Sequence, residues 1–565
     1  MTENVVRSKE RKGKSPGYVF LAGVLTGALL FFLTYGTEVL SFTYDGWIFK
    51  VSDPDIHQHY LGWCHFRKSP WFFPPGLMDS MSYPHRISVL WTDSIPLFAI
   101  FFKLFRDILP ETFQYLGFYG FLSFCLTGGT AALAAKKLTG SDAAALIAVP
   151  LITESFPMLQ RMFYHTSLTA HYLILIPLCI WLYDGYKWSI RKKCLVWGGY
   201  FFITVMMHPY LWLMGAVIAV AAFISEIITT KDVKPALITG GVSGILTYAA
   251  LFLSGALYGN VKVSYALGGF GSNLNTFVNS LNMGQILPEL PLQNPNQYEG
   301  FGYLGAGGIV LVLTAGVLWL FDKAGRCREG EKLPFSGREA VLCILTAVFF
   351  IMAVFPDITF NTKLLLSIRV NPGIEAILGI FRSAGRFIWP VVILLYLGAL
   401  KVITDHGRKK RKDRFAVVFI ILCLVLQFID MSKTVASRHE KFTAYAKPLK
   451  GDLENEALKT RIGQYDRIVF VTDDQFSMER AAYFAAKHGL TVNKYYFARS
   501  IDEEVGETLK QYHDECASGN APGNVIFIFD EESMEEWRKD TDLHFYDLTG
   551  TIVGLSDEIN LPEID

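Results

Sequence analysis

The stretch MTENVVRSKERKGKSPGYVFLAGVLTGALLFFLTYG (residues 1–36) decides the fold class of this chain. A basic head is followed by an apolar run of about 20 residues, the length needed to cross roughly 30 Å of membrane hydrocarbon. A secretory signal peptide begins in the same way, but no convincing small-x-small cleavage site follows here, and many more apolar runs do. The stretch therefore predicts an uncleaved first span of a protein with several spans.

The composition of the whole chain is also that of a membrane protein. Of its 565 residues, 51% are hydrophobic and 14% are aromatic, whereas 18% are charged, against about a quarter in average domains. Lys+Arg and Asp+Glu both number 52, so the net charge gives no reason to expect a nucleic-acid partner. The eight cysteines show no CxxC or zinc-like spacing, which indicates neither a disulfide framework nor a thiolate metal site.

Apolar runs of spanning length recur along the chain and predict about eleven spans. They begin near Tyr18, Phe113, Ser141, Ser167, Cys194, Tyr210, Pro235, Tyr303, Ala340, Arg386 and Phe415. A further run at 95–109 is short and contains Lys103, so it predicts an interfacial amphipathic helix rather than a crossing. If it does not cross, the basic clusters lie on the side of the N-terminus, which the positive-inside rule assigns to the cytoplasm. These clusters are 134–138, 186–193, 231–234, 322–332 and 405–414.

The same topology predicts three parts of the chain. These are a cytoplasmic basic tail (1–17), a transmembrane domain (18–430) and an extracytoplasmic domain (431–565), in which strand-like and helix-like patterns alternate as in a small α/β fold. No internal repeat is visible, which weakens the inverted-repeat transporter as an interpretation. The unusual polar residues gather in the segments predicted on the outer face: 41–112, 154–171, 258–300 and 356–386.

The first of these segments contains VSDPDIHQHYLGW (51–63). In an extended chain, Asp53 and Asp55 would point to the same side, where they could hold a divalent cation. Alternatively, one carboxylate could act as a general base, which must be ionised and within reach of its target hydroxyl. The simpler interpretation is that Asp and His beside a helix end are ordinary interfacial polar residues.

A second group of candidates lies in IFRSAGRFIWP (380–390). Arg382 and Arg386 are four positions apart, which predicts one helical face, and guanidinium groups bind phosphate in a bidentate manner. Snorkelling at a helix end is the alternative. Arg369 and Lys363 could assist. Together with the Asp pair, these arginines suggest group transfer from a lipid phosphate.

Other polar residues of the outer segments are weaker candidates. His165 and His171, with Arg161, bracket the end of one span, and a further histidine begins the HPY sequence at 208–210. Single histidines in such places are usually satisfied interfacial residues. Glu299 could begin a helix or contact a substrate, and Asp93 could cap the interfacial helix.

The chain resembles the GT-C class of polytopic glycosyltransferases and, more closely, a bacterial membrane-protein family of unassigned function that we associate with that class. The matching pieces run in order from DIHQHYLGWCHFRKSPWFFPPG (55–76) and YPHRISVLWTDSIPLFAIFFKLF (83–105) to FRSAGRFIWPV (381–391). The closer family's pattern has an Asp four positions before the histidine of H-(F/Y)-L-G-W. Asp55 and His59 match it, and Asp53 lies outside it. His57 and Gln58 depart from the pattern, which has smaller residues there.

The resemblance implies an α-helical polytopic fold with interfacial helices in the first outer loop, a polyprenyl-phosphate-linked sugar donor and an active site on the outer face of a bacterial cytoplasmic membrane. We expect inverting transfer to an envelope glycan, lipid or protein, with Asp55 as the base and Asp53 as second choice. Arg382, Arg386 and Arg369 would bind the donor phosphate. Sugar hydroxyls or a cation would be held by His59, Asp93, His165, His171 and Glu299. The alternatives are a lipid-linked glycan transporter or flippase, and a non-catalytic accessory subunit.

Overall fold

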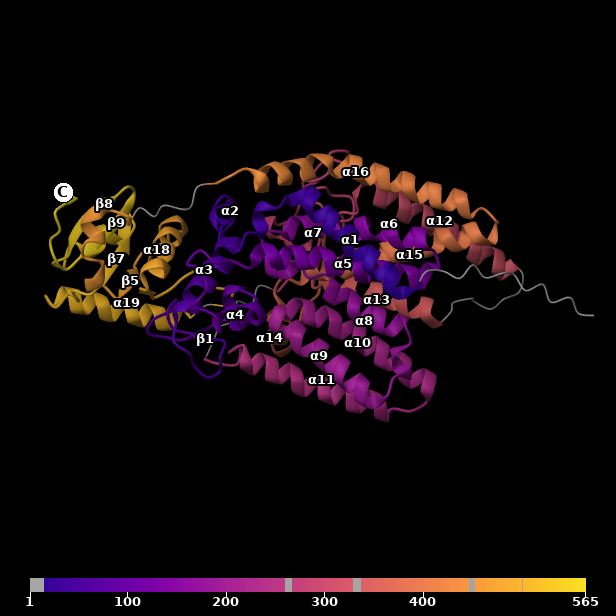
Figure 1. The fold of residues 1–565 in the computed structure, drawn as a ribbon, viewed down its shortest axis with the longest axis horizontal. Helices are drawn as coiled ribbons and strands as arrows, with labels where there is room; N and C mark the ends of the chain where they lie inside the picture. Colours follow the sequence, from indigo (N-terminus) through magenta and orange to yellow (C-terminus); the bar gives the residue numbers. More distant parts are fainter. Residues whose placement is uncertain (1–14, 260–266, 329–336, 447–452, 500, 565) are drawn as a thin grey trace, which may run out of the picture.

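A computed structural model describes residues 15–259, 267–328, 337–446, 453–499 and 501–564. Figure 1 shows a bundle of long helices with a small α/β domain at the end marked C. Among the described residues, nine helical stretches are long and apolar enough to cross a membrane. They are formed by α1 (Pro16–Tyr35), α5 (Leu116–Thr139), α6 (Asp142–Thr153) with α7 (Phe156–Arg161), α10 (Pro209–Thr230), α11 (Lys234–Leu253), α12 (Gly305–Arg328), α13 (Gly337–Val354), α15 (Ile388–Lys409) and α16 (Asp413–Thr443).

The prediction of about eleven spans therefore exceeds the number of such helices in the described chain. The two remaining predicted spans correspond to helices that are not both long and apolar enough to be counted, each for a different reason. The stretch Thr166–Leu182, which ends with α8 (Tyr172–Leu182), is apolar but shorter. The next helix, α9 (Ile190–Met207), begins with the basic residues Arg191, Lys192 and Lys193. Both helices pack against other helices of the bundle, α8 against α5 and α10, and α9 against α10 and α11.

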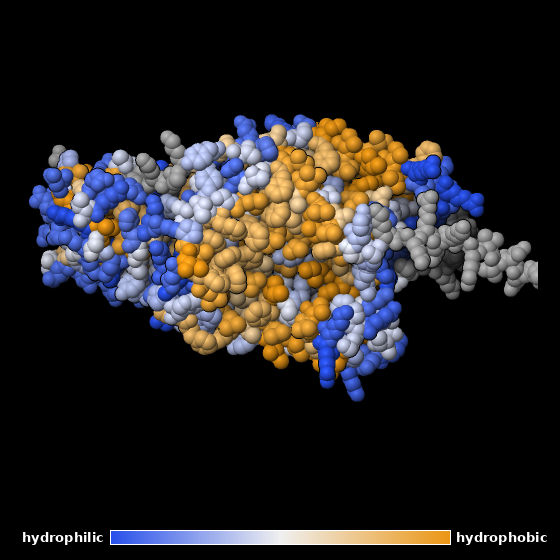
Figure 2. Space-filling model, viewed as in Figure 1, coloured by the Kyte–Doolittle hydropathy of each residue, from blue (hydrophilic) through white to orange (hydrophobic). Residues whose placement is uncertain are grey.

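Successive helices alternate in direction, so the connections gather at two ends of the bundle (Figure 1). One end holds the short connections that carry the basic clusters 134–138, 186–193, 231–234 and 405–414; the cluster 322–332 lies partly outside the described residues. The other end, which we call the domain end, holds the long loops and the C-terminal domain, as the sequence pattern predicts. Figure 2 shows an apolar belt between two hydrophilic ends. Such a belt is the surface that membrane spans present to lipid.

Two predicted borders can be compared with the described residues. Of the predicted tail 1–17, residues 1–14 lie outside the described residues. The border predicted at 431 falls inside α16, which continues to Thr443. The composition becomes polar before the helix ends, because the last turns of α16 leave the apolar belt while keeping their helical hydrogen bonds.

The first long loop, between α1 and α5, is folded into short elements. It contains η1 (Glu38–Leu40), α2 (Gly46–Phe49), α3 (Pro54–Lys68), paired β1 (Leu77–Met78) and β2 (Ile87–Ser88), η2 (Val89–Thr92) and α4 (Pro96–Lys103). The short helix α4 has 8 residues and does not cross, and Phe101, Leu104 and Phe105 in and beside it are exposed. This agrees with the predicted interfacial helix.

The other long connections at the domain end carry short elements too. They are η5 (Pro295–Gly300) before α12, and β3 (Asp357–Phe360), β4 (Lys363–Ser367), α14 (Pro372–Leu378), η6 (Gly379–Phe381) and η7 (Ala384–Phe387) before α15. The elements η5 and η7 approach closely, since a Cβ added to Gly385 would lie 2.6 Å from the Cα of Gly300. Glycine at these positions brings the neighbouring side chains of the two loops together.

The C-terminal domain is built on a five-stranded sheet with the order β6-β5-β7-β9-β8. The first three strands in this order are parallel, and β9 is antiparallel to both of its neighbours. The strands are β5 (Arg467–Phe470), β6 (Thr491–Val492), β7 (Val525–Phe529), β8 (His544–Leu548) and β9 (Thr551–Leu555). The helices are α17 (Glu456–Lys459), α18 (Gln475–His488), α19 (Asp502–Ala517) and α20 (Glu531–Trp537).

This domain packs on the first long loop through α18 and α3 (Figure 1). His57 Nδ1 lies 2.6 Å from a carboxylate oxygen of Glu479. The Tyr483 hydroxyl donates to the buried Asp45 carboxylate at 2.7 Å. Such buried polar contacts have strict geometry, so they hold the domain at one position against the loop.

Candidate active site

A cavity of about 370 Å³ opens at the domain end, where the first long loop, the ends of α9, α10 and α11, and the C-terminal domain meet. Its ionisable lining residues are Asp55, Asp93, His165, His208, Glu299, Arg382, Arg386 and Arg499. Another part of its wall is apolar and includes Val205, Trp212 and Leu251. The cavity therefore joins a charged region to an apolar wall at the ends of the spans.

Asp55 does not occupy the extended segment that the sequence pattern predicts. Asp53 is the N-cap of α3, its Oδ1 accepts the Asp55 N–H at 3.0 Å, and Pro54 begins the helix. The two carboxylates therefore have different surroundings. Asp53 caps the helix and is not among the residues that line the cavity, whereas Asp55 in the first turn does line it.

A chain of acidic and imidazole groups begins at Asp55. Its Oδ2 lies 2.8 Å from His165 Nδ1, and the other nitrogen of His165 lies 3.3 Å from Asp93 Oδ2. Asp93 Oδ1 lies 3.4 Å from His208 Nε2. Because His208 Nδ1 accepts the Tyr210 N–H, Nε2 carries the proton of the neutral ring and points it toward Asp93.

The pKa shifts of these aspartate and histidine side chains favour an ion pair. Burial opposes charge on His165, but the carboxylates of Asp55 and Asp93 raise its pKa to about 9. Burial would raise the pKa of Asp55, yet His165 holds it below its usual value. The pKa of Asp93 is held well below its usual value in the same way, by His165 and His208 against the effect of burial. At neutral pH a cationic His165 therefore lies between two carboxylates.

Close packing positions Asp93. A Cβ added to Gly62 in α3 would lie 2.3 Å from Thr92 Oγ1, so the glycine of HYLGW lets α3 approach η2. Asp93 (φ 52°) and Ile95 (φ 54°) both have left-handed backbones, a strained conformation for a β-branched residue such as Ile95. The N-cap of α4 is Ile95 and has no side-chain hydrogen bond, so the predicted capping role of Asp93 is wrong.

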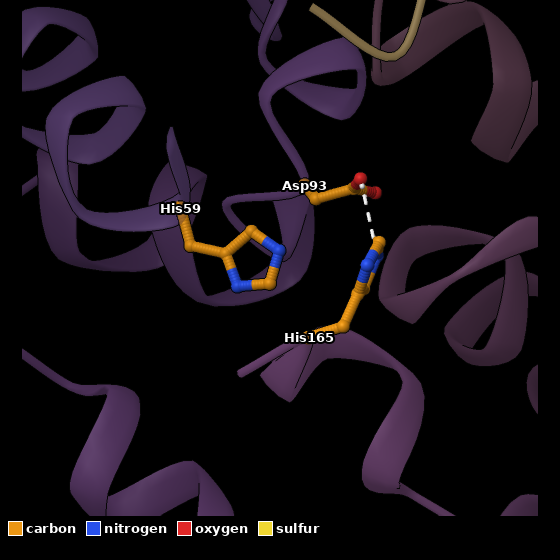
Figure 3. Close-up of side chains that lie close together, drawn as sticks. All are labelled: His59, Asp93 and His165. Carbon is orange, nitrogen blue, oxygen red and sulfur yellow. Dashed lines mark ion pairs between the residues drawn. The ribbon is translucent and has the colours of Figure 1, made fainter. Parts of the chain in front are cut away.

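His59 lies beside this chain and could complete a metal site (Figure 3). Ligand atoms of His59, Asp93 and His165 all lie within 4.8 Å of one another. Within the described chain, neither ring nitrogen of His59 has a hydrogen-bond partner, and burial lowers its pKa to about 3. The neutral His59 ring offers one free lone pair and Asp93 offers a carboxylate, ligands that suit Zn²⁺ or Mn²⁺, and a bound cation would displace the proton of His165 to make it the third ligand. The donor set fits a divalent cation here, away from the predicted pair Asp53 and Asp55.

Glu299 is buried between two guanidinium groups. Its Oε2 lies 2.7 Å from Arg161 Nη2 and 2.7 Å from Arg386 Nε. Burial would raise the pKa of Glu299, but the two arginines hold it far below its usual range. The cluster of Arg161, Glu299 and Arg386 carries one excess positive charge. The Glu299 carboxylate holds the Arg386 side chain in place.

The spacing of four predicts that Arg382 and Arg386 share one helical face. In the structure they do not. Arg382 follows η6, and Ser383 has a non-helical backbone (φ −83°, ψ 60°) before η7 begins. The Tyr210 hydroxyl accepts the Ser383 N–H at 2.8 Å and holds this break. Arg386 consequently turns to Glu299, while Arg382 lines the cavity with no ion pair among the described residues.

Two predicted site residues lie elsewhere. Arg369 is exposed between β4 and α14, and it does not line the cavity. His171 is buried at the start of α8, with its ring 5.4 Å from that of Trp389. It packs among the spans because α8 continues directly from it into the bundle. Neither residue can contact a ligand in the cavity as it stands.

The C-terminal domain contributes residues that the sequence analysis does not identify. Tyr496 and Arg499 line the cavity, although they are more than 100 positions beyond Arg386. The backbone fixes them, because Gln58 Nε2 donates to the Tyr496 carbonyl at 2.6 Å and the Ala498 N–H donates to the Trp91 carbonyl at 2.8 Å. The aromatic run before Arg499 is a weak signal, and no local pattern connects it to the first loop.

Two solved structures of an oligosaccharyltransferase from Archaeoglobus fulgidus resemble this chain. The apo form has a TM-score of 0.47 and 12% sequence identity, over 98% of this chain and 76% of that chain. The second, AglB in complex with an inhibitory peptide and a dolichol-phosphate, has a TM-score of 0.38 and 11% identity, over 97% and 75% of the two chains. No curated protein matches the chain.

The family comparison covers most of the chain. A family model described as a domain of unknown function (DUF6311) matches residues 24–432. A second model, described as the DUF6311 C-terminal domain, matches residues 457–556. The order of the two matches is that of the helical bundle and the α/β domain. The chain belongs to the DUF6311 family.

Proposed function

We propose that this protein transfers a sugar from a polyprenyl-phosphate-linked donor to a cell-envelope glycan, lipid or protein at the outer face of a bacterial cytoplasmic membrane. One observation supports this most directly: Asp55 and Arg382 line the same cavity, beside an apolar wall at the ends of the spans. A carboxylate and a guanidinium that face one small space are suited to act on the two sides of a sugar–phosphate bond. The resemblance of residues 55–391 to GT-C proteins agrees with this function.

The charge balance of the cavity suits an anionic donor. Three carboxylates line it, against three arginines and the cationic His165. Arg382 is the side chain best placed to bind the phosphate, with Arg499 from the C-terminal domain beside it. Val205, Trp212 and Leu251 would contact the first isoprene units, which are apolar.

The proposed reaction is a displacement with inversion. An acceptor hydroxyl attacks the anomeric carbon and its proton passes to Asp55, while the bond from that carbon to the phosphate oxygen breaks and its electron pair stays on the phosphate. Arg382 stabilises the charge that develops on the phosphate. A divalent cation bound by His59, Asp93 and a deprotonated His165 would replace the single charge of the imidazolium with two positive charges. The Asp55 side chain is 21% exposed, so a hydroxyl can reach it.

The test is the envelope-glycan composition, by mass spectrometry, of a deletion strain that carries either wild type or Asp55→Asn. We expect wild type alone to restore the missing sugar. The matched control is Asp53→Asn, because Asn caps a helix as well as Asp does and the residue does not line the cavity. Restoration by Asp55→Asn, or identical glycans in all strains, would refute the proposal.

The same strains, with one more that lacks the C-terminal domain, separate the alternatives. A transporter places charged residues near the middle of the membrane, whereas the ionisable residues of this cavity lie at the domain end. An accessory subunit would keep its function in Asp55→Asn and lose it when the C-terminal domain is removed. An enzyme of the proposed kind requires both Asp55 and the C-terminal domain, because Tyr496 and Arg499 of that domain complete the cavity wall.

A further inference from the structure

The C-terminal domain has a second cavity, of about 280 Å³, beside the segment that carries Tyr496. Its wall comes from the start of α18, from the residues after β6 and from the start of α19. Tyr496 lines both this cavity and the one that contains Asp55. The candidate active site and the second cavity therefore share a wall residue.

Two residues in the wall of the second cavity carry buried polar atoms without partners among the described residues. The Tyr495 side chain is only 7% exposed, and its hydroxyl has no hydrogen-bond partner in the described part of the chain. The same holds for Nε2 of Gln475. Buried polar groups in native proteins are nearly always satisfied, and those that are not require an explanation. Both residues line the second cavity, where a bound ligand could supply the missing partners.

The remaining wall combines aromatic and charged side chains. Tyr496 and Phe497 supply aromatic rings, and Lys494 pairs with Asp473 at 2.5 Å. A second carboxylate, Asp502, leaves the wall with one excess negative charge. Sugar rings present C–H groups that pack on aromatic faces and hydroxyls that both donate and accept hydrogen bonds. The excess negative charge disfavours phosphate- or carboxylate-bearing polymers.

We propose that the second cavity binds a neutral sugar residue of the acceptor, so that the acceptor is an envelope glycan whose chain passes Tyr496 to reach Asp55. This inference rests on the function proposed above and specifies its acceptor. The backbone contacts of Tyr496 to Gln58 and of Ala498 to Trp91 fix the spacing between the two cavities. The acceptor hydroxyl would thus be presented at a set distance from the base.

Saturation-transfer NMR on the full-length protein in detergent micelles tests the site without a donor. The probes are maltotriose, mannotriose, cellotriose and tri-N-acetylchitotriose, with trigalacturonic acid as the anionic comparison. We expect at least one neutral probe to bind, and Tyr495→Phe to weaken that binding by about fivefold or more, the usual effect of one lost hydrogen bond. Tyr495→Phe should fold normally, because the hydroxyl that it removes has no partner in the described chain.

The matched control is Tyr512→Phe, which removes a hydroxyl of the same domain outside the cavity and should bind the probe as wild type does. Asp55→Asn should also bind it normally. The inference is overturned if no neutral probe binds, if the anionic probe binds as well, or if Tyr495→Phe binds as tightly as wild type. If a neutral probe binds but Asp55→Asn leaves the glycans unaltered, the proposed transferase activity is refuted and the second cavity remains a sugar-binding site. Lost glycans without probe binding would refute the acceptor site alone.

Discussion

Replacing Glu299 by Gln should destabilise the protein strongly. The carboxylate receives four N–H contacts: Arg161 at 2.7 and 3.4 Å, and Arg386 at 2.7 and 3.3 Å. A Gln side chain accepts at one oxygen only, and its amide N–H would face guanidinium N–H groups. The loss of two charge-assisted hydrogen bonds, at about 1.5–3 kcal/mol each, should lower the free energy of unfolding by roughly 3–6 kcal/mol. Breaking a buried ion pair usually costs about 3–5 kcal/mol, which agrees.

The assay is the free energy of unfolding from denaturant titration in detergent micelles. Glu289→Gln is the control, because this residue lies in the same loop and is exposed, where substitutions change stability by at most about 0.5 kcal/mol. The reasoning is refuted if Glu299→Gln lowers the unfolding free energy by less than about 1 kcal/mol, or by no more than the control does.

The pH dependence supplies an independent readout of the same cluster. The pKa of Glu299 is lowered in the folded protein, against the effect of burial, by Arg161 and Arg386. Its contribution to stability is therefore complete above the unfolded pKa of about 4.3 and is lost as the pH falls below that value. Glu299→Gln has no such carboxyl, so its stability should decline less steeply below about pH 4.3. Equal slopes would contradict the assigned ion pairs.

Three further changes have defined outcomes. Arg382→Gln should weaken binding of polyprenyl phosphate at least about tenfold, whereas Arg369→Gln, outside the cavity, should not; equal effects would contradict the assignment. Asp93→Asn should lower affinity for Mn²⁺ or Zn²⁺ at least about tenfold by titration calorimetry, whereas Asp53→Asn should leave it unchanged. Burial lowers the pKa of Lys103 to about 7, so wild-type stability should rise between about pH 7 and 10.5, and that rise should be absent in Lys103→Met.

The order of the helices could be predicted from sequence because it depends on two local signals. Apolar length predicts spans, and the position of basic residues predicts the end at which each connection lies. The two predicted spans that are not among the nine apolar helices of the described chain illustrate the limit of the first signal. The stretch Thr166–Leu182 and α9 pack against other helices, and such contacts stabilise a helix that is short or begins with charge.

The site could be predicted only in part, for a related reason. Asp53 followed by Pro54 is a sequence pattern typical of a helix N-terminus. It identifies Asp53 as the capping carboxylate and distinguishes it from Asp55, which lines the cavity. The contact between Asp55 and His165 joins residues 110 positions apart, and no local pattern encodes it. Sequence reasoning identified both residues as candidates because charged residues are rare in such a chain, but it could not predict their pairing.

The arginines after α14 show how tertiary contacts assign different roles to similar residues. A spacing of four predicts one helical face only if the helix is continuous, and the hydrogen bond from Ser383 to Tyr210 breaks it. Arg386 then meets Glu299, because Gly300 and Gly385 let the two loops touch. That carboxylate holds the Arg386 guanidinium in place, whereas Arg382 has no ion pair among the described residues, which makes Arg382 the better candidate for a phosphate ligand. A continuous helix would place Arg382 and Arg386 on one face, so the break at Ser383 is what allows the two arginines to take different roles in the proposed donor site.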